Sequence, residues 1–295
     1  MNVDLVPGKY VVAVSGGVDS ISLLHILQNQ PGVRLVVAHF DHGIREDSAE
    51  DRRLVQNVAR NYGLPFVYDA GNLGTGASEA AARKARYRFL RRVQQASGAR
   101  AIITAHHQDD LLETAILNIL RGTGRKGLTA LSDRPDMVRP LLHVPKQDLI
   151  NYAHDQGLVW REDSTNQDEN YHRNYIRQRV LSRFNEQARE EFRQIIAHLQ
   201  TVNHELDNSL VNQLHQQTKA GQLDRVWFNH LPHEVAREVM AGWLRAHGTL
   251  SFDRKTLERL VVAAKVTAAD KRVDIMNGLT MNVGKLNLAL TDGER

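Results

Sequence analysis

Acidic and imidazole side chains gather in one short stretch of the chain, and their types are those that bind metal ions. His106 and His107 are followed by Asp109, Asp110 and Glu113, so three carboxylates fall within five residues. Carboxylate oxygens are the ligands that Mg²⁺ prefers, and nucleotide chemistry needs Mg²⁺ to offset phosphate charge. Zinc on the two histidines and Asp109 is the poorer alternative, because adjacent histidines rarely share one metal geometry. The stretch therefore predicts a site for Mg²⁺.

A second polar stretch, Ser15-Gly16-Gly17-Val18-Asp19-Ser20, called here the serine–glycine loop, has the composition of a phosphate-binding loop. Its two glycines let phosphate oxygens approach the backbone, and its two serines carry hydroxyl donors. In a turn before a helix, successive N–H groups face one spot and the helix dipole adds partial positive charge. The loop is not of the Walker A kind, because no Gly-Lys pair followed by Ser or Thr occurs in the chain. Asp19 is expected to bind a metal or to orient a hydroxyl group.

The elements that must position these groups alternate between strands and helices. Short apolar runs predict strands at 10–14, 33–40, 65–68, 101–105 and 138–142, and helical spacing predicts helices at 21–27, 48–62, 78–96, 111–120 and 145–157. Such alternation indicates a doubly wound parallel sheet, whose ligands bind beyond the carboxyl ends of the strands. The serine–glycine loop, the loop around His39, Asp41 and His42, and the stretch that starts at His106 all leave from that edge.

Some of these residues also have structural explanations. Asp110 could cap its helix, with Glu113 three residues later closing a capping box, but a cap does not account for all three acids. The G-x-G-x-x-G pattern at 122–127 follows a helix instead of a strand, so we expect a helix end and a basic loop there. The sequence Asp163-Ser164-Thr165-Asn166 has the composition of a turn.

Length and composition limit the classes of protein to which the chain could belong. The chain has 295 residues, which favours two domains, and 42% hydrophobic residues, which is ample for a core. The absence of cysteine excludes disulfides, thiolate metal sites, iron–sulfur clusters and a catalytic thiol. With no apolar run of 18 residues and no basic, apolar start, the chain reads as cytoplasmic and not membrane-spanning.

The second half of the chain has a different pattern from the first. A long helix is predicted at 185–214, with further helices at 234–246 and 253–265 and a hairpin joining 273–276 to 279–283. We therefore expect a boundary near Phe184, with an α/β catalytic domain at 1–184 and a smaller, mainly helical domain at 185–295. The basic residues are also clustered: seven Lys or Arg lie between 83 and 100, and four Arg between 171 and 183, without an acid in either segment. Such patches suit a polyanion.

The set of motifs resembles one known family. The matching stretches lie in that family's order between residues 10 and about 185, and they are 15–20, 39–45, 79–83 with 86–87, 106–110 with 113–114, 163–166 and 173–177. On these residues the chain resembles the tRNA(Ile)-lysidine synthetases, which belong to the ATP pyrophosphatase (PP-loop) superfamily. The resemblance stops at Phe184, beyond which no motif matches. The chain also looks shorter than members with two C-terminal domains.

The resemblance implies a two-step reaction. ATP adenylates O2 of the wobble cytidine in the isoleucine tRNA with a CAU anticodon, and L-lysine then attacks C2 through its ε-amine, giving lysidine, AMP and pyrophosphate. It implies ATP and Mg²⁺ as substrate and cofactor, with ATP bound by Ser15, Gly16, Gly17, Val18, Asp19, Ser20, His39, Arg45 and His106. The catalytic residues would be Asp19, Asp109, Asp110, Glu113, Arg173 and Arg177, of which Asp19 and Asp109 would hold Mg²⁺. Because the two basic segments contain no acid, we expect them to carry part of the tRNA contact, through Arg83, Lys84, Arg88, Arg91, Arg92, Arg173, Arg177 and Arg179.

Other members of the superfamily are alternatives. The tRNA thiolases need a persulfide cysteine or an iron–sulfur cluster, and glutaminase-coupled synthetases usually use a cysteine nucleophile, so the absence of cysteine argues against both. Another adenylating ligase, or a tRNA-binding protein with a vestigial ATP site, stays open. The sequence leaves the oligomeric state open as well, with a homodimer as one option.

Overall fold

The computed structural model describes residues 1, 3–43, 48–71, 79–161, 172–249, 252–276 and 278–292. The chain divides into two compact units, Met1–Leu199 and Gln200–Arg295, which are described here one at a time. The division falls within the long helix α8 (Glu186–Gln217), whereas the boundary expected near Phe184 lies just before that helix begins. Arg45 and the predicted turn at 163–166 lie outside the described residues.

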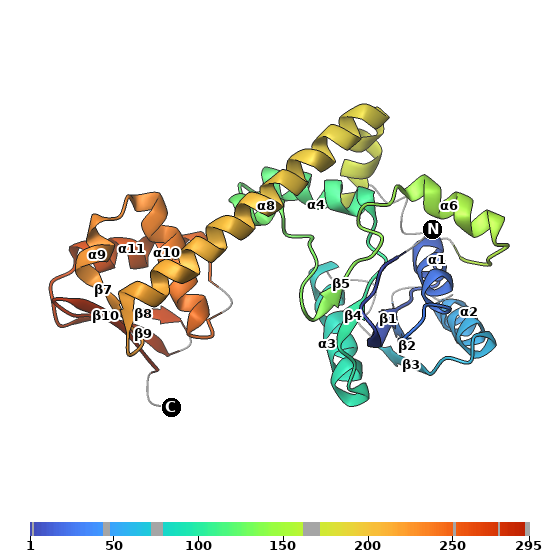
Figure 1. Ribbon diagram of the computed structural model, residues 1–295, viewed down its shortest axis with the longest axis horizontal. Coiled ribbons are helices and arrows are strands. Elements are labelled where there is room, and N and C mark those ends of the chain that lie inside the picture. The colour runs from blue at the N-terminus through green and yellow to red at the C-terminus, as the bar shows by residue number, and fades with distance from the viewer. Residues whose placement is uncertain are drawn as a thin grey trace. The chain divides into compact units, whose positions relative to one another are not determined.

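The first unit is built on a parallel sheet in the order β3-β2-β1-β4-β5 (Figure 1). Its strands are β1 (Gly8–Ala13), β2 (Val33–Asp41), β3 (Phe66–Ala70), β4 (Ala101–Ile103) and β5 (Met137–Val138). Strand β1 is central and pairs in parallel with β2 on one side and β4 on the other. The strand order reverses between β1 and β4, which is where open sheets of this kind bind their ligands. The predicted doubly wound parallel sheet is confirmed.

Helices cover both faces of this sheet, and the alternation of side chains along β1 explains why. Tyr10 and Val12 point into a core shared with α1 (Val18–Leu27), α2 (Ser48–Asn61) and α6 (Lys146–Asp155). Val11 points the other way, into a core shared with α3 (Glu79–Ser97). Both faces of β1 are therefore apolar, as a central parallel strand requires.

A third apolar cluster joins α4 (Gln108–Leu120) to the segment that enters α8. This segment contains α7 (His172–Tyr175), a π-helical turn (Ile176–Val180) and a 3₁₀ turn (Leu181–Arg183). Leu112 and Ala115 of α4 pack with Ile176 and Leu181 of that segment and with Ile196 of α8. The packing brings the arginines of 173–189 beside the first turns of α4.

Two predicted elements differ in the structure. The strand expected at 138–142 is reduced to Met137–Val138, since Pro140 has no N–H for a strand ladder and the chain turns there. The expected helix end at 122–127 is present, because α4 stops at Leu120 and Gly122 has a φ of +64°. The basic loop that follows also forms a short helix, α5 (Arg125–Leu128).

The second unit combines helices with an antiparallel sheet. It contains the end of α8 and the helices α9 (Arg225–His230), α10 (His233–Ala246) and α11 (Arg254–Val266). Its sheet has the order β6-β7-β10-β9-β8, from β6 (Thr218–Lys219), β7 (Gln222–Asp224), β8 (Lys271–Met276), β9 (Leu279–Val283) and β10 (Asn287–Asp292). The pairing of β8 with β9 confirms the predicted hairpin. Strands β6, β7 and β10 were not predicted from the sequence. Among the described helices, none has the length and apolarity needed to cross a bilayer.

Candidate active site

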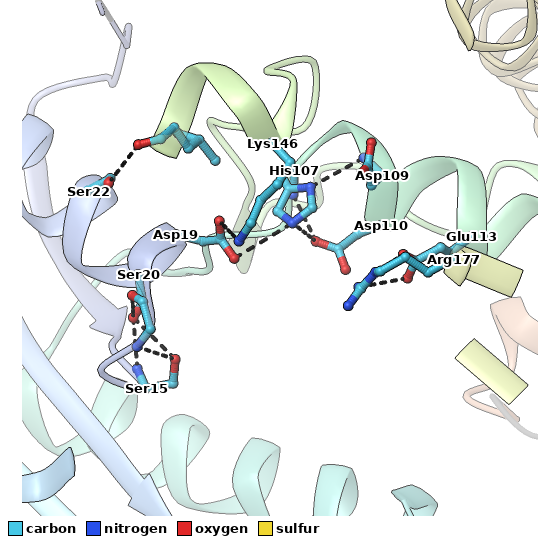
Figure 2. Close-up of polar contacts among 12 residues, drawn as sticks. Ser15, Asp19, Ser20, Ser22, His107, Asp109, Asp110, Glu113, Lys146 and Arg177 are labelled. Carbon is cyan, nitrogen blue, oxygen red and sulfur yellow. Dashed lines mark hydrogen bonds and ion pairs between the residues drawn. The ribbon is translucent and has the colours of Figure 1, made fainter. Parts of the chain in front are cut away.

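The serine–glycine loop joins the end of β1 to α1 and is held in shape by Ser20. The Ser20 hydroxyl oxygen accepts hydrogen bonds from the N–H of Ser15 at 3.1 Å and of Gly16 at 3.2 Å, and its O–H donates to the Gly17 carbonyl at 3.0 Å (Figure 2). The first N–H groups of α1, beginning at Val18, have no partner within the helix. The sequence suggested that successive loop amides face one external spot. In the structure the amides of Ser15 and Gly16 point inward to the Ser20 hydroxyl, and the amide of Gly17 donates to the Ser15 hydroxyl at 3.5 Å.

A second set of contacts fixes the loop from outside. Gly16 has a φ of +105°, and a Cβ atom at this position would lie 3.5 Å from the Cβ atom of Asp51 in α2. The Gly16 carbonyl accepts a hydrogen bond from the N–H of Arg161 at 3.0 Å, and the Arg161 guanidinium donates to Asp51 at 2.8 Å. The same guanidinium pairs with Glu50. The sequence motifs pointed to neither Arg161 nor its two acidic partners.

The carboxylate of Asp19 contacts a lysine and a histidine that come from other elements (Figure 2). The Lys146 ammonium nitrogen is 2.5 Å from one carboxylate oxygen of Asp19, and Nε2 of His107 is 3.6 Å from the other. Lys146 is the first residue of α6, and His107 directly precedes α4. From the sequence alone, Lys146 has no role and His107 is considered only as a zinc ligand, because nothing local to either residue indicates that it reaches Asp19.

His107, and not Asp110, is the N-cap of α4. Its Nδ1 accepts a hydrogen bond from the N–H of Asp109 at 3.3 Å, and the Asp110 carboxylate accepts one from the N–H of His107 at 3.0 Å. The expected capping box therefore exists, but it begins three residues earlier, and Asp110 closes it where Glu113 was expected to. With Nδ1 acting as acceptor, a neutral His107 carries its proton on Nε2, 3.5 Å from Asp110. Burial raises the pKa of Asp110, but the neighbouring His107, through its imidazole and its backbone N–H, and the Arg173 guanidinium outweigh it and lower that pKa to about 2.

The two other histidines are held in neutral form. His106 hydrogen-bonds through Nδ1 to the Thr104 hydroxyl at 2.7 Å, and burial lowers its pKa to about 3. His39 donates from Nδ1 to the Val14 carbonyl at 2.9 Å, and burial lowers its pKa too. In the part of the chain that the structure describes, no three His, Asp or Glu side chains converge as a metal cluster, so the zinc alternative gains no support there.

Glu113 is fully buried and is bound by an arginine. Its two carboxylate oxygens accept hydrogen bonds from Arg177 at 2.6 and 3.2 Å (Figure 2). Nε of Arg173 lies 3.6 Å from one of these oxygens. Arg173 also donates to the Thr114 hydroxyl at 3.0 Å. Burial raises the pKa of Glu113, and Arg177 opposes that rise. Burial lowers the pKa of Arg177, but Glu113 outweighs it, so the net shift is upward.

The three acids of α4 therefore face three different partners. Asp109 accepts a hydrogen bond from Arg189 of α8 at 2.8 Å, Asp110 contacts His107, and Glu113 contacts Arg177. They lie on one helix but do not converge on a single point. Asp109 and Asp110 remain partly exposed, whereas Glu113 does not.

The basic residues of α3 lie mostly on its exposed face. Lys84 and Arg88 are exposed, as is Arg179 in the π-helical turn, while Arg83 is half-buried beside the Tyr87 ring. Acids from other elements neutralise part of the patch. Arg91 pairs with Asp136 at 3.4 Å, and Arg92 pairs with Asp69 at 2.5 Å.

A sheet whose first strand runs through a serine–glycine loop into a helix is the architecture of a PP-loop domain, and the family model of that description matches residues 2–184. A tRNA(Ile)-lysidine synthase of Thermotoga sp. (strain RQ2) is 38% identical over 185 residues, covering 59% of this chain and 45% of that protein. One from Thermus thermophilus is 41% identical over 202 residues, covering 61% and 39%. One from Nostoc sp. (strain PCC 7120 / SAG 25.82 / UTEX 2576) is 34% identical over 268 residues, covering 86% and 74%.

Within the PP-loop class, the chain belongs to the tRNA(Ile)-lysidine synthase family. It spans less than half the length of the Thermotoga and Thermus relatives.

Proposed function

We propose that the protein forms lysidine on the isoleucine tRNA with a CAU anticodon. In the first step O2 of the wobble cytidine attacks the α-phosphorus of ATP and pyrophosphate leaves. In the second, the ε-amine of L-lysine attacks C2, AMP leaves with O2, and the amine gives up its proton. The observation that carries the proposal is that two groups of residues lie side by side. They are the serine–glycine loop after β1 and, after β4, the acids Asp109, Asp110 and Glu113 of α4 with their arginine partners, on either side of the point where the strand order reverses.

The first step would use the loop and Asp19. The N-terminus of α1 and the loop hydroxyls suit the β- and γ-phosphates of ATP. Asp19 fits Mg²⁺, since it presents a partly exposed carboxylate at that helix end, and Mg²⁺ commonly binds one or two carboxylates together with substrate phosphates. When bound, the ion offsets the charge of the departing pyrophosphate. His39 and His106, being neutral, would contact the nucleotide as hydrogen-bonding groups and not as cations.

The second step would use the partly exposed acids of α4. A lysine amine is protonated at neutral pH and cannot attack, so a carboxylate must bind the cation and accept a proton. Asp109 and Asp110 are placed to do this, and we assign Asp109 to lysine because it lies on α4, away from the phosphate-binding end of α1, and its carboxylate binds a cationic nitrogen group, as it would bind an ammonium. Glu113 is buried against Arg177, so its part is to hold that arginine toward the phosphate or the developing negative charge.

The tRNA would lie against the basic surface of the first unit. The exposed basic residues of α3, together with the arginines at 173–179, are cations suited to the phosphate backbone. The region 185–295 would add to the contact with tRNA as a separate, smaller domain.

One assay tests the reaction. The protein is incubated with ATP, labelled lysine and the CAU-anticodon isoleucine tRNA, and we expect equal amounts of labelled tRNA, AMP and pyrophosphate. Asp19→Ala should abolish pyrophosphate release in a protein that still folds, because a loop carboxylate contributes little to core packing. Asp148→Ala, an exposed acid in the first turn of α6, is the matched control and should behave as wild type. Absence of label from the tRNA, or wild-type pyrophosphate release by folded Asp19→Ala, would overturn the proposal.

A further inference from the structure

A lysine that the sequence does not associate with the nucleotide loop reaches it in the structure. The loop lacks the lysine that a Walker A sequence carries next to its glycines. Lys146, which lies 127 residues after Asp19, places its ammonium nitrogen 2.5 Å from the Asp19 carboxylate (Figure 2). A positive charge thus stands at the phosphate-binding end of α1, although it comes from a different helix.

Packing of α6 against α1 fixes the position of the Lys146 backbone. Leu149 of α6 is fully buried in the core that contains α1, and its carbonyl accepts a hydrogen bond from the Ser22 hydroxyl at 3.4 Å. One turn further on, the Tyr152 hydroxyl lies 2.8 Å from Nδ1 of His25. These contacts hold the first turn of α6 over the N-terminus of α1. The backbone of Lys146 is therefore positioned by the core, while its flexible side chain extends to the Asp19 carboxylate.

The ion pair is accessible to a ligand. The Lys146 and Asp19 side chains are 32% and 27% exposed, in contrast to the fully buried carboxylate of Glu113. Arg161, whose backbone N–H also bonds to the loop, is bound to the acids of α2. Lys146 differs from Arg161 because its acidic partner belongs to the loop itself and is the carboxylate proposed to bind Mg²⁺.

We propose that Lys146 is a further nucleotide-binding residue, and this rests on the proposed use of ATP. In the protein without nucleotide its ammonium neutralises Asp19. When Mg²⁺ takes the Asp19 carboxylate, the ammonium turns to the oxygens of the pyrophosphate end of ATP. A lysine suits this exchange, since it is a compact charge with three donors on a flexible stem. The negative charge that develops on the departing pyrophosphate would then meet a preplaced cation.

Calorimetric titration without tRNA tests the assignment. The ligands are α,β-methylene-ATP with Mg²⁺, which carries the β- and γ-phosphates, and AMP, which lacks them. Lys146→Met should weaken binding of the ATP analogue roughly 10- to 100-fold, the usual range for losing hydrogen bonds to a charged group, and leave AMP binding unchanged. Lys146→Arg should restore part of the affinity. Gln147→Met, an exposed neighbour on the same helix, is the matched control and should bind both ligands as wild type does.

Three results would overturn the assignment. The first is equal binding of the ATP analogue by wild type and folded Lys146→Met. The second is an equal loss of affinity for AMP, which would remove Lys146 from the pyrophosphate end. The third is a wild-type protein that does not bind the analogue at all, which would overturn the ATP-dependent function together with this inference. If Lys146→Met does not fold, Lys146→Gln is titrated in its place and read in the same way. If the ion pair were purely structural, Lys146→Met would lower the melting temperature of the free protein and leave both ligand affinities unchanged.

Discussion

Single residues in the acid cluster are expected to act at different stages because they touch different partners. Asp109 is partly exposed beside Arg189, whereas Glu113 is buried against Arg177. An exposed carboxylate can accept a proton from a substrate amine, and a buried carboxylate bound at both oxygens cannot do so without releasing its arginine. Substitutions at these two positions should therefore give different defects.

Asp109→Asn should block the second step more than the first. It removes the proposed proton acceptor without touching the nucleotide loop, so pyrophosphate release should continue while lysidine formation falls by roughly 10²- to 10⁴-fold. Adenylated tRNA should then accumulate, and rapid-quench trapping of radiolabelled AMP on tRNA measures it. Glu113→Gln is the comparison. It should lower the free energy of unfolding by about 2 kcal/mol, because it weakens the charge-assisted pair between Glu113 and Arg177. Failure of adenylation in Asp109→Asn would assign Asp109 to Mg²⁺ instead.

Two histidines should make stability depend on pH. Burial lowers the pKa of both His39 and His106, the latter from 6.5 to about 3, so the folded protein binds these protons less readily than the unfolded chain. The free energy of unfolding should therefore be fully present above pH 6.5 and decrease as the pH falls toward 3. The slope is at most about 1.4 kcal/mol per pH unit for each histidine. Urea unfolding between pH 7.5 and 4.5 measures it, with a smaller slope expected for His106→Asn and an unchanged slope for the exposed His204→Asn. Equal slopes in all three proteins would contradict the expectation.

At the level of elements, the C-terminal end of α11 depends on a residue from another helix. Arg225, the first residue of α9, is buried and donates from its guanidinium to the carbonyls of Ala264 at 2.8 Å, Thr267 at 2.6 Å and Gly284 at 2.7 Å. The last carbonyls of a helix have no partner within the helix, and a cation there also interacts favourably with the negative end of the helix dipole. Arg225 thus ties α11 to the turn between β9 and β10.

Arg225→Met should remove all three bonds and leave buried carbonyls without donors. We expect the free energy of unfolding of the second unit to fall by about 3 kcal/mol. Denaturant unfolding followed by the fluorescence of Trp243, which is buried in this unit's core, measures the loss. Arg272→Met, an exposed arginine on β8, is the control and should change stability by less than about 0.5 kcal/mol. A loss no larger than that of the control would show that the carbonyls find other donors.

The sequence predicted most of the first unit because its signals are contiguous. Each apolar run of β1, β2 and β4 and the whole serine–glycine loop can be recognised within ten residues. The loop's partners could not be predicted in this way. Lys146 lies 127 residues from Asp19, and Arg189 lies 80 residues from Asp109, so these contacts exist only once the helices pack. Strands β6 and β7 were missed for a different reason, since two or three residues are too few to show a period of two.

At the level of the whole molecule, a net charge of +4 is modest, so binding of tRNA would depend on where the charge is concentrated. Acids from neighbouring elements pair with Arg91 and Arg92 and so reduce the net positive charge in the second half of α3. Lys84 and Arg88 lie nearer the start of the helix and are exposed. They are therefore the better test of whether this surface meets a polyanion.

Charge reversal at Lys84 and Arg88 together should weaken tRNA binding and flatten its dependence on salt. Removing one ion pair with a phosphate should reduce the slope of log affinity against log salt by about 0.7 to 0.9. Filter binding at several salt concentrations measures the slope. Arg60→Glu, an exposed arginine on α2 at the opposite face of the sheet, is the matched control and should leave the slope unchanged. An unchanged slope in the double variant would assign this face of α3 to solvent.

The hydroxyl of Ser20 has a consequence for the speed of nucleotide binding. Because it already satisfies the amides of Ser15 and Gly16, the loop keeps its shape without phosphate, and an arriving nucleotide need only reorient side chains such as Lys146. Side chains rotate in picoseconds to nanoseconds, whereas ordering a loop takes nanoseconds to microseconds. Association should then be limited by diffusion and charge, and the protein should lose little conformational entropy on capture.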